Sequence, residues 1–159
     1  MKNLFFFLLA VSLPAFGISQ SNCSDLVIFP DNGKGGTALR PIEPEGLSVK
    51  LLNVEHTYVL ISLSTADKGV CFEPGQPISF VFADGSEVSL TNDIDGNCSQ
   101  AAMINLGGNH KKQEELDQLR HKLVTSIRFV SNAGQREASF SPENQRTFQD
   151  VINCIAEKI

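Results

Sequence analysis

The densest group of potential metal ligands in the sequence is the segment 92–97, Asn-Asp-Ile-Asp-Gly-Asn. Asp93 and Asp95 supply carboxylates, which calcium prefers, and the glycine that follows them matches the sixth position of an EF-hand loop. In that alignment Thr91 and Ala102 take the first and last positions, where the loop requires carboxylates. A turn in which Asn and Asp side chains bond to nearby backbone accounts for the same residues. Asp93 and Asp95 are therefore a weak calcium candidate, and we expect no other metal site.

Side chains that could catalyse hydrolysis are scattered along the chain. None of the three histidines, His56, His110 and His121, belongs to an H-E-x-x-H pair. No serine stands in a G-x-S-x-G motif. An enzyme would need at least two of the following candidates to converge within hydrogen-bond reach: His56, Glu73, Glu87, Asp93 and Asp95. We therefore predict no catalytic residue and no cofactor, with a small secreted hydrolase or carbohydrate-active enzyme as an alternative.

Residues 1–19 have the three parts of a cleavable signal peptide. Lys2 gives a cationic start, the run 4–13 is apolar, and Gly17 and Ser19 are the small residues before the cut. The apolar run is about half the length that spans a bilayer. We expect cleavage after Ser19, with Gly17 as the alternative, and a secreted or periplasmic protein without a membrane anchor.

Charge and length restrict the possible partners of the mature chain. Without Lys2, 12 Lys and Arg residues face 18 Asp and Glu residues, a net charge near −6. Such a surface repels phosphate backbones and anionic lipid, so we expect neither nucleic-acid binding nor membrane-surface binding. No second apolar stretch approaches spanning length, so we expect no membrane insertion after the signal is removed. The remaining length suits one domain with its own core.

The dipeptide Asp84-Gly85 lies between apolar segments and is a hairpin turn signal. A three-residue loop over 83–85 sets Phe80 opposite Val88, and thereby places apolar side chains on one face. It also sets Ile78 opposite Leu90. A two-residue turn would mix apolar and polar residues on that face, so we predict the three-residue loop.

The four cysteines, Cys23, Cys71, Cys98 and Cys154, contain no C-x-x-C pair. An even number in an exported chain predicts disulfides, with three possible pairings. The hairpin register, extended backwards, brings Cys71 within about one residue of lying opposite Cys98. We therefore predict Cys71–Cys98 and Cys23–Cys154, with Cys98–Cys154 as the main rival.

Apolar periodicity predicts the other elements. They are strands at Leu47–Val54, Thr57–Ser64 and Ala101–Leu106, and a helix at Gln113–Leu123. A second hairpin joins Leu123–Val130 with Gln135–Phe140 and has Ile127 and Phe129 on its inner face. The phase changes between Leu51 and Leu52, which predicts a bulge there. Residues 20–46 are rich in Pro and Gly and are predicted to be irregular.

The last helix has the strongest signal. Ser141 is a suitable N-cap, Pro142 suits the first helical position, and Glu143 adds an acid to the first turn. One apolar stripe follows, formed by Phe148, Val151, Ile152, Ile155 and Ile159.

These elements predict a single compact α+β domain over residues 47–159. About seven antiparallel strands would form a sheet, or a small, partly open barrel, with the C-terminal helix covering it. The order matches that of a pleckstrin-homology-like barrel, and a two-layer sheet crossed by one helix fits equally.

The stretch Val70–Asn97 resembles small exported proteins of Bacteroidota-type bacteria. The similarity lies in Cys71-Phe72-Glu73-Pro74-Gly75 and Phe82-Ala83-Asp84-Gly85-Ser86. The strand 126–129 and the closing helix with Asn153-Cys154 extend it over roughly residues 47–157. That family has no established activity, so the resemblance implies no catalytic residues. It implies a bacterial host and an envelope or secreted location.

Together these features predict a disulfide-stabilised, non-enzymatic binding or interaction module with an unidentified protein, glycan or small ligand. Its surface should carry an apolar or aromatic patch, or a shallow groove, and no deep polar pocket. Besides the hydrolase, a calcium-dependent adhesion module using Asp93 and Asp95 is the second alternative.

Overall fold

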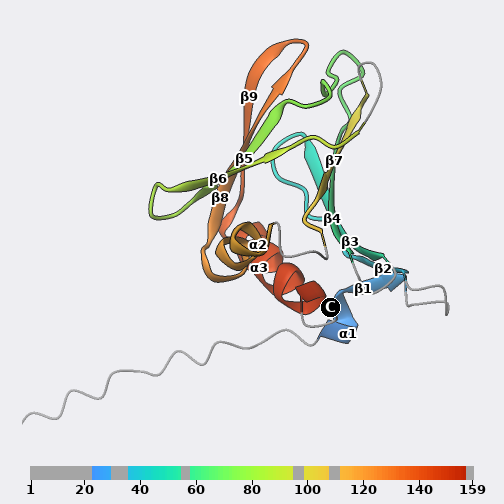
Figure 1. The fold of residues 1–159 in the computed structure, drawn as a ribbon, viewed down its shortest axis with the longest axis vertical. Helices are drawn as coiled ribbons and strands as arrows, with labels where there is room; N and C mark the ends of the chain where they lie inside the picture. Colours follow the sequence, from blue (N-terminus) through green and yellow to red (C-terminus); the bar gives the residue numbers. More distant parts are fainter. Residues whose placement is uncertain (1–22, 30–35, 55–57, 95–98, 108–111, 157–159) are drawn as a thin grey trace, which may run out of the picture.

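The computed structural model describes residues 23–29, 36–54, 58–94, 99–107 and 112–156 (Figure 1). Within these ranges the chain forms three helices and nine strands, and the strands make two antiparallel sheets. The predicted signal peptide, together with His56, Asp95, Cys98, His110 and Ile159, lies outside the described residues.

The first sheet has five strands in the order β1-β2-β3-β4-β7. They are β1 Val27–Phe29, β2 Gly36–Leu39, β3 Leu47–Val54, β4 Tyr58–Thr65 and β7 Ala101–Asn105. Burial alternates along β3 and β4, as it does in strands with one face against a core. The inward residues Val49, Leu51, Ile61 and Leu63 are fully buried.

The predicted bulge in β3 is wrong. Pairing between β3 and β4 is continuous from Leu47 opposite Thr65 to Val54 opposite Tyr58. Leu51 faces the core, and Leu52 lies half-buried on the outer face of the sheet. The phase change in the sequence therefore reflects an apolar outward residue and leaves the register intact.

The prediction of an irregular N-terminal segment is also wrong. The segment 20–46 contains α1 (Cys23–Leu26) as well as β1 and β2, and β2 pairs with β3. Leu26, Leu39 and Ile42 are buried in the common core. These strands have three and four residues, too few to establish an alternating pattern in the sequence.

The second sheet has four strands in the order β6-β5-β8-β9. They are β5 Pro77–Phe82, β6 Glu87–Thr91, β8 Val124–Ser131 and β9 Gly134–Ser139. The predicted register of the first hairpin is confirmed, because Phe80 pairs with Val88 and Ile78 with Leu90. Gly85 has a φ of +81°, a left-handed conformation that glycine adopts without strain.

Helices α2 (Gln113–His121) and α3 (Pro142–Ala156) lie between the lower ends of the two sheets (Figure 1). The Ser141 Oγ accepts a hydrogen bond from the Asn144 N–H at 3.2 Å, so the predicted N-cap is confirmed. Phe148 of α3 packs against Phe80, with 5.9 Å between ring centroids. The apolar stripe of α3 thus packs into the common core and covers it on the side of the helices.

The predicted α+β class, the C-terminal helix and the seven strands between residues 47 and 140 are confirmed. Over the described residues the two sheets stay separate and do not close into a barrel. The two-layer alternative therefore describes the fold. No helix in the described part of the chain has both the length and the hydropathy to cross a membrane.

Candidate functional site

The Cys23–Cys154 disulfide is present as predicted, with a Cα–Cα distance of 5.5 Å. It ties α1 to α3, so the rival Cys98–Cys154 pairing is wrong. Cys71 is also disulfide-bonded, and its predicted partner Cys98 lies outside the described residues. Next to Cys71, the N–H of Phe72 donates to the Ser99 carbonyl at 2.7 Å. This contact supports the predicted Cys71–Cys98 pair, which stays a prediction.

The acidic segment predicted as a turn or a calcium loop joins the two sheets. Asn92 is buried, its Nδ2 donates to the Glu73 carbonyl at 3.0 Å, and its Oδ1 accepts the Met103 N–H at 3.1 Å. The same oxygen accepts the Ile94 N–H at 3.3 Å, which is the local side-chain-to-backbone turn predicted from the sequence. Asn92 therefore has a structural role.

Asp93 is also occupied by protein contacts. Its Oδ2 accepts the Asn105 N–H at 2.7 Å and lies 3.5 Å from Lys112 Nζ. Within the described ranges no three His, Cys, Asp or Glu side chains are placed to hold a metal ion.

Two of the described catalytic candidates, Glu87 and Asp93, lie at opposite ends of one strand. Glu87 begins β6 and Asp93 lies beyond its end, so the whole strand, about 13 Å long, separates them. His121 is exposed in the last turn of α2. Glu73 contributes its backbone carbonyl to the contact with Asn92. Among the described candidates, Glu87 is therefore held apart from Asp93 by the length of β6.

One carboxylate pair that the sequence did not reveal lies on the outer face of the four-stranded sheet. Arg128 bridges it, with Nη1 3.1 Å from Glu87 Oε2 and Nε 3.2 Å from Glu137 Oε2. The Ser126 hydroxyl donates to Glu137 and, together with Arg128, holds the pKa of that carboxyl below its usual value. A general acid in glycoside cleavage needs a raised pKa, so Glu137 is unsuited to that role. Arg128 and Glu137 face each other across the hairpin of β8 and β9, and this pairing was the signal in the sequence that could have revealed their ion pair.

A surface groove of about 620 Å³ lies between the N-terminal elements and the start of α3. We call it the terminal groove; its charged lining residues are Asp25, Arg40, Glu43 and Glu143. The Asn144 Nδ2 donates to the Glu43 carbonyl at 3.0 Å and fixes the segment 40–43 against α3.

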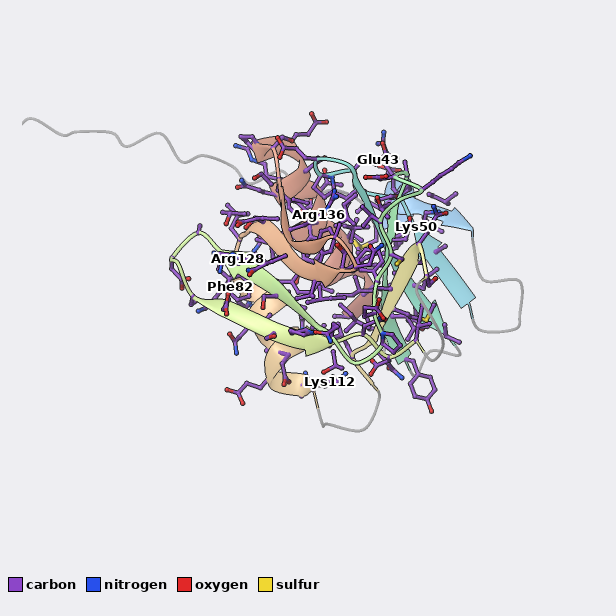
Figure 2. All side chains as sticks on the ribbon, turned by 90° about the horizontal axis from the view of Figure 1, so that it is seen from above. Glu43, Lys50, Phe82, Lys112, Arg128 and Arg136 are labelled. Carbon is purple, nitrogen blue, oxygen red and sulfur yellow. A yellow bond between two sulfur atoms is a disulfide. The ribbon has the colours of Figure 1, made fainter. Side chains whose placement is uncertain are left out.

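A second hollow of about 430 Å³ adjoins the terminal groove through Glu43. It runs along 43–48 to the end of β4 and includes the exposed carboxylate of Glu45. Figure 2 shows Glu43 well apart from Arg128, so the grooves and the carboxylate pair occupy different parts of the surface.

The carboxylates along these hollows differ from most others in their surroundings. Six described carboxylates have basic partners: Asp67, Asp84, Glu87, Asp93, Asp117 and Glu137. In the part of the chain that the structure describes, none of the four carboxylates at the hollows makes an ion pair, and neither does Arg40. Among the described residues, Asp25 accepts a single hydrogen bond, from the neighbouring Ser24 hydroxyl.

The outer face of the five-stranded sheet is partly apolar. Leu52 pairs with Leu60 across β3 and β4, and both are half-buried. Exposed Tyr58 and half-buried Met103 lie on the same face. The described surface thus has a groove and an apolar patch.

Asn53 is a buried polar residue without a clear role. It lies on the inner face of β3, and neither atom of its amide has a hydrogen-bond partner among the described residues. It lines neither hollow.

Comparison with protein-family models, with curated proteins and with solved structures finds no significant match.

Proposed function

We propose that this chain is an exported, disulfide-stabilised, non-enzymatic binding module of a bacterial cell envelope or secretome. The terminal groove carries the proposal, because its charged side chains have no ion-pair partners among the described residues. Its volume of about 620 Å³ falls in the range typical of ligand sites.

The construction of the groove supports a role in recognition. Its walls come from α1 and β1, from segment 40–43, and from α3, which are distant in sequence. The Cys23–Cys154 disulfide and the Asn144–Glu43 hydrogen bond hold these walls together. A site that is rigid before binding loses less conformational entropy when a ligand arrives.

Export is supported by the signal-peptide pattern of residues 1–19 and by the disulfides, which persist in oxidising compartments. N-terminal sequencing of the mature protein should find Gln20 as its first residue. A mature protein that keeps Met1 would contradict export by cleavage.

Site-specific photocrosslinking in the producing cell tests the binding role. A benzophenone amino acid at Ile28, which is exposed in the groove, should crosslink a partner. The matched control is Ser89, which is exposed on β6 away from the groove. A crosslink from Ile28 alone supports the proposal. Crosslinks from Ser89 alone, or from neither position, would overturn it.

A further inference from the structure

We propose that the terminal groove binds a basic peptide segment in which lysine or arginine residues flank an apolar residue. This inference rests on the proposed function, in which the groove is the ligand-binding surface. It adds the chemical class of the ligand, which follows from the charges, the apolar surface and the shape of the groove.

The first argument is charge complementarity. Asp25, Glu43 and Glu143 place three carboxylates around the groove, against one cation, Arg40. All four side chains are exposed and lack ion-pair partners within the described ranges. Cationic groups of a ligand can therefore pair with these carboxylates without breaking an existing ion pair.

The second argument is the apolar surface within the groove. Ile28 on the edge strand β1 is 44% exposed, and it is one of two large apolar side chains exposed in the described structure. Half-buried Pro41 continues this surface. An apolar side chain of the ligand would cover Ile28, which a purely ionic ligand would leave in water.

The third argument is the spacing of the carboxylates. Because no three of the described His, Cys, Asp and Glu side chains converge as metal ligands, a single divalent ion does not suit the groove. The second hollow extends the acidic surface from Glu43 to Glu45. Separated carboxylates along a continuous path match cations spaced along an extended chain.

Arg40 distinguishes a peptide from a simple polyamine. A guanidinium donates hydrogen bonds and accepts none, so Arg40 can bond to the carbonyls of a peptide backbone. A polyamine has no acceptor for it and would be repelled by its charge. The polyamine is therefore the appropriate competitor in the test.

The test is fluorescence anisotropy with the exported, disulfide-intact protein. The probe is a labelled, end-capped peptide of alternating lysine and leucine, titrated at low salt and at about 0.15 M salt. Saturable binding that weakens with salt is expected. Peptides with glutamate in place of lysine, or glycine in place of leucine, should bind at least about tenfold more weakly.

Two double variants locate the binding surface. Glu43→Gln/Glu143→Gln should raise the Kd about tenfold, since each exposed ion pair contributes a few-fold. The matched control is Glu114→Gln/Glu115→Gln on α2, two carboxylates that also lack basic partners among the described residues. It should leave the Kd within about twofold. Equal losses in both variants, or full displacement of the peptide by equimolar spermine, would overturn the proposal.

The outcomes separate the ligand class from the binding role. If the lysine–leucine peptide does not bind while Ile28 still crosslinks a partner, the ligand class is wrong and the proposed function stands. If Ile28 crosslinks nothing, the proposed function fails with its ligand.

Discussion

The backbone N–H of Met103 donates a hydrogen bond to the side-chain oxygen of Asn92 at 3.1 Å, and this contact links the two sheets. Asn92 directly follows β6 of the four-stranded sheet, and Met103 lies at the centre of β7, an edge strand of the five-stranded sheet. The carbonyl of Met103 accepts the N–H of Asp93 at 2.7 Å. The consecutive residues Asn92 and Asp93 thus supply hydrogen-bond partners for the backbone of Met103 at the edge of β7. Free backbone groups at such an edge would invite pairing with another chain.

Substitution of Asn92 by alanine should destabilise the protein by about 2–4 kcal/mol, because it leaves three buried or half-buried backbone groups without their partner. Urea unfolding of the purified protein measures this change. Ser89→Ala, an exposed change on β6, should stay within about 0.5 kcal/mol and serves as control. A loss below about 1 kcal/mol for Asn92→Ala would refute the linking role.

Calcium should leave the thermal midpoint unchanged. Asp93 is already engaged by the Asn105 N–H and by Lys112, so binding of calcium to it would require breaking these contacts. Melting curves with excess calcium and then with chelator test this directly, since a specific ligand must raise the midpoint. A reproducible rise with calcium would revive the adhesion alternative based on Asp93 and Asp95.

The parts of the fold that the sequence predicted correctly have local signals. The first hairpin follows from one turn dipeptide and the alternation beside it, and α3 follows from Ser141, Pro142 and a regular apolar stripe. The strands β1 and β2 have no comparable signal, because their pairing is determined by β3 and by the disulfide of Cys23. Tertiary contacts create these strands.

The groove could not be predicted for a related reason. Glu43 and Asn144, whose contact fixes one wall, are 101 positions apart. The sequence shows which residues are acidic, but it does not show which carboxylates find a basic partner. Arg128 pairs with two carboxylates, and Arg40, in the groove, makes no ion pair among the described residues. That difference becomes visible only when the sheets are assembled.

Replacement of Asn53 by leucine should stabilise the protein by about 1–2 kcal/mol. The amide is buried on an apolar face without a partner in the described structure, and a buried polar group without a hydrogen bond costs roughly that much. Leucine has a similar shape and removes the cost. Urea unfolding measures the gain, with Leu51→Asn as the opposite change on the same face. A less stable Asn53→Leu protein would show that the amide holds a bound water or ligand group.

Acid should remove one electrostatic contribution to stability. Hydrogen bonds from the Ser86 hydroxyl and N–H, and the neighbouring Lys122, lower the pKa of Asp84 from 3.8 to about 2. A carboxyl whose pKa is lower in the folded state stabilises the fold above its unfolded pKa, and this contribution disappears as the pH falls from about 4 to about 2. The stability difference between the native protein and Asp84→Asn should therefore shrink over that interval. The difference for Ser89→Ala, which changes no titrating group, should stay constant. Carboxyl NMR titration of Asp84 with a midpoint near 4 would contradict the assignment.

Removal of the Cys23–Cys154 disulfide should have the largest effect on stability. The bond closes a loop with a sequence separation of 131, so Cys23→Ser/Cys154→Ser should lower the free energy of unfolding by about 2–5 kcal/mol. Because the bond also anchors α1, which lines the terminal groove, crosslinking from Ile28 should fall in the same variant. Urea unfolding and the crosslinking assay measure the two effects. A decrease in stability without any change in crosslinking would show that the groove keeps its shape without the disulfide, and would contradict the proposed role of the disulfide in holding its walls together.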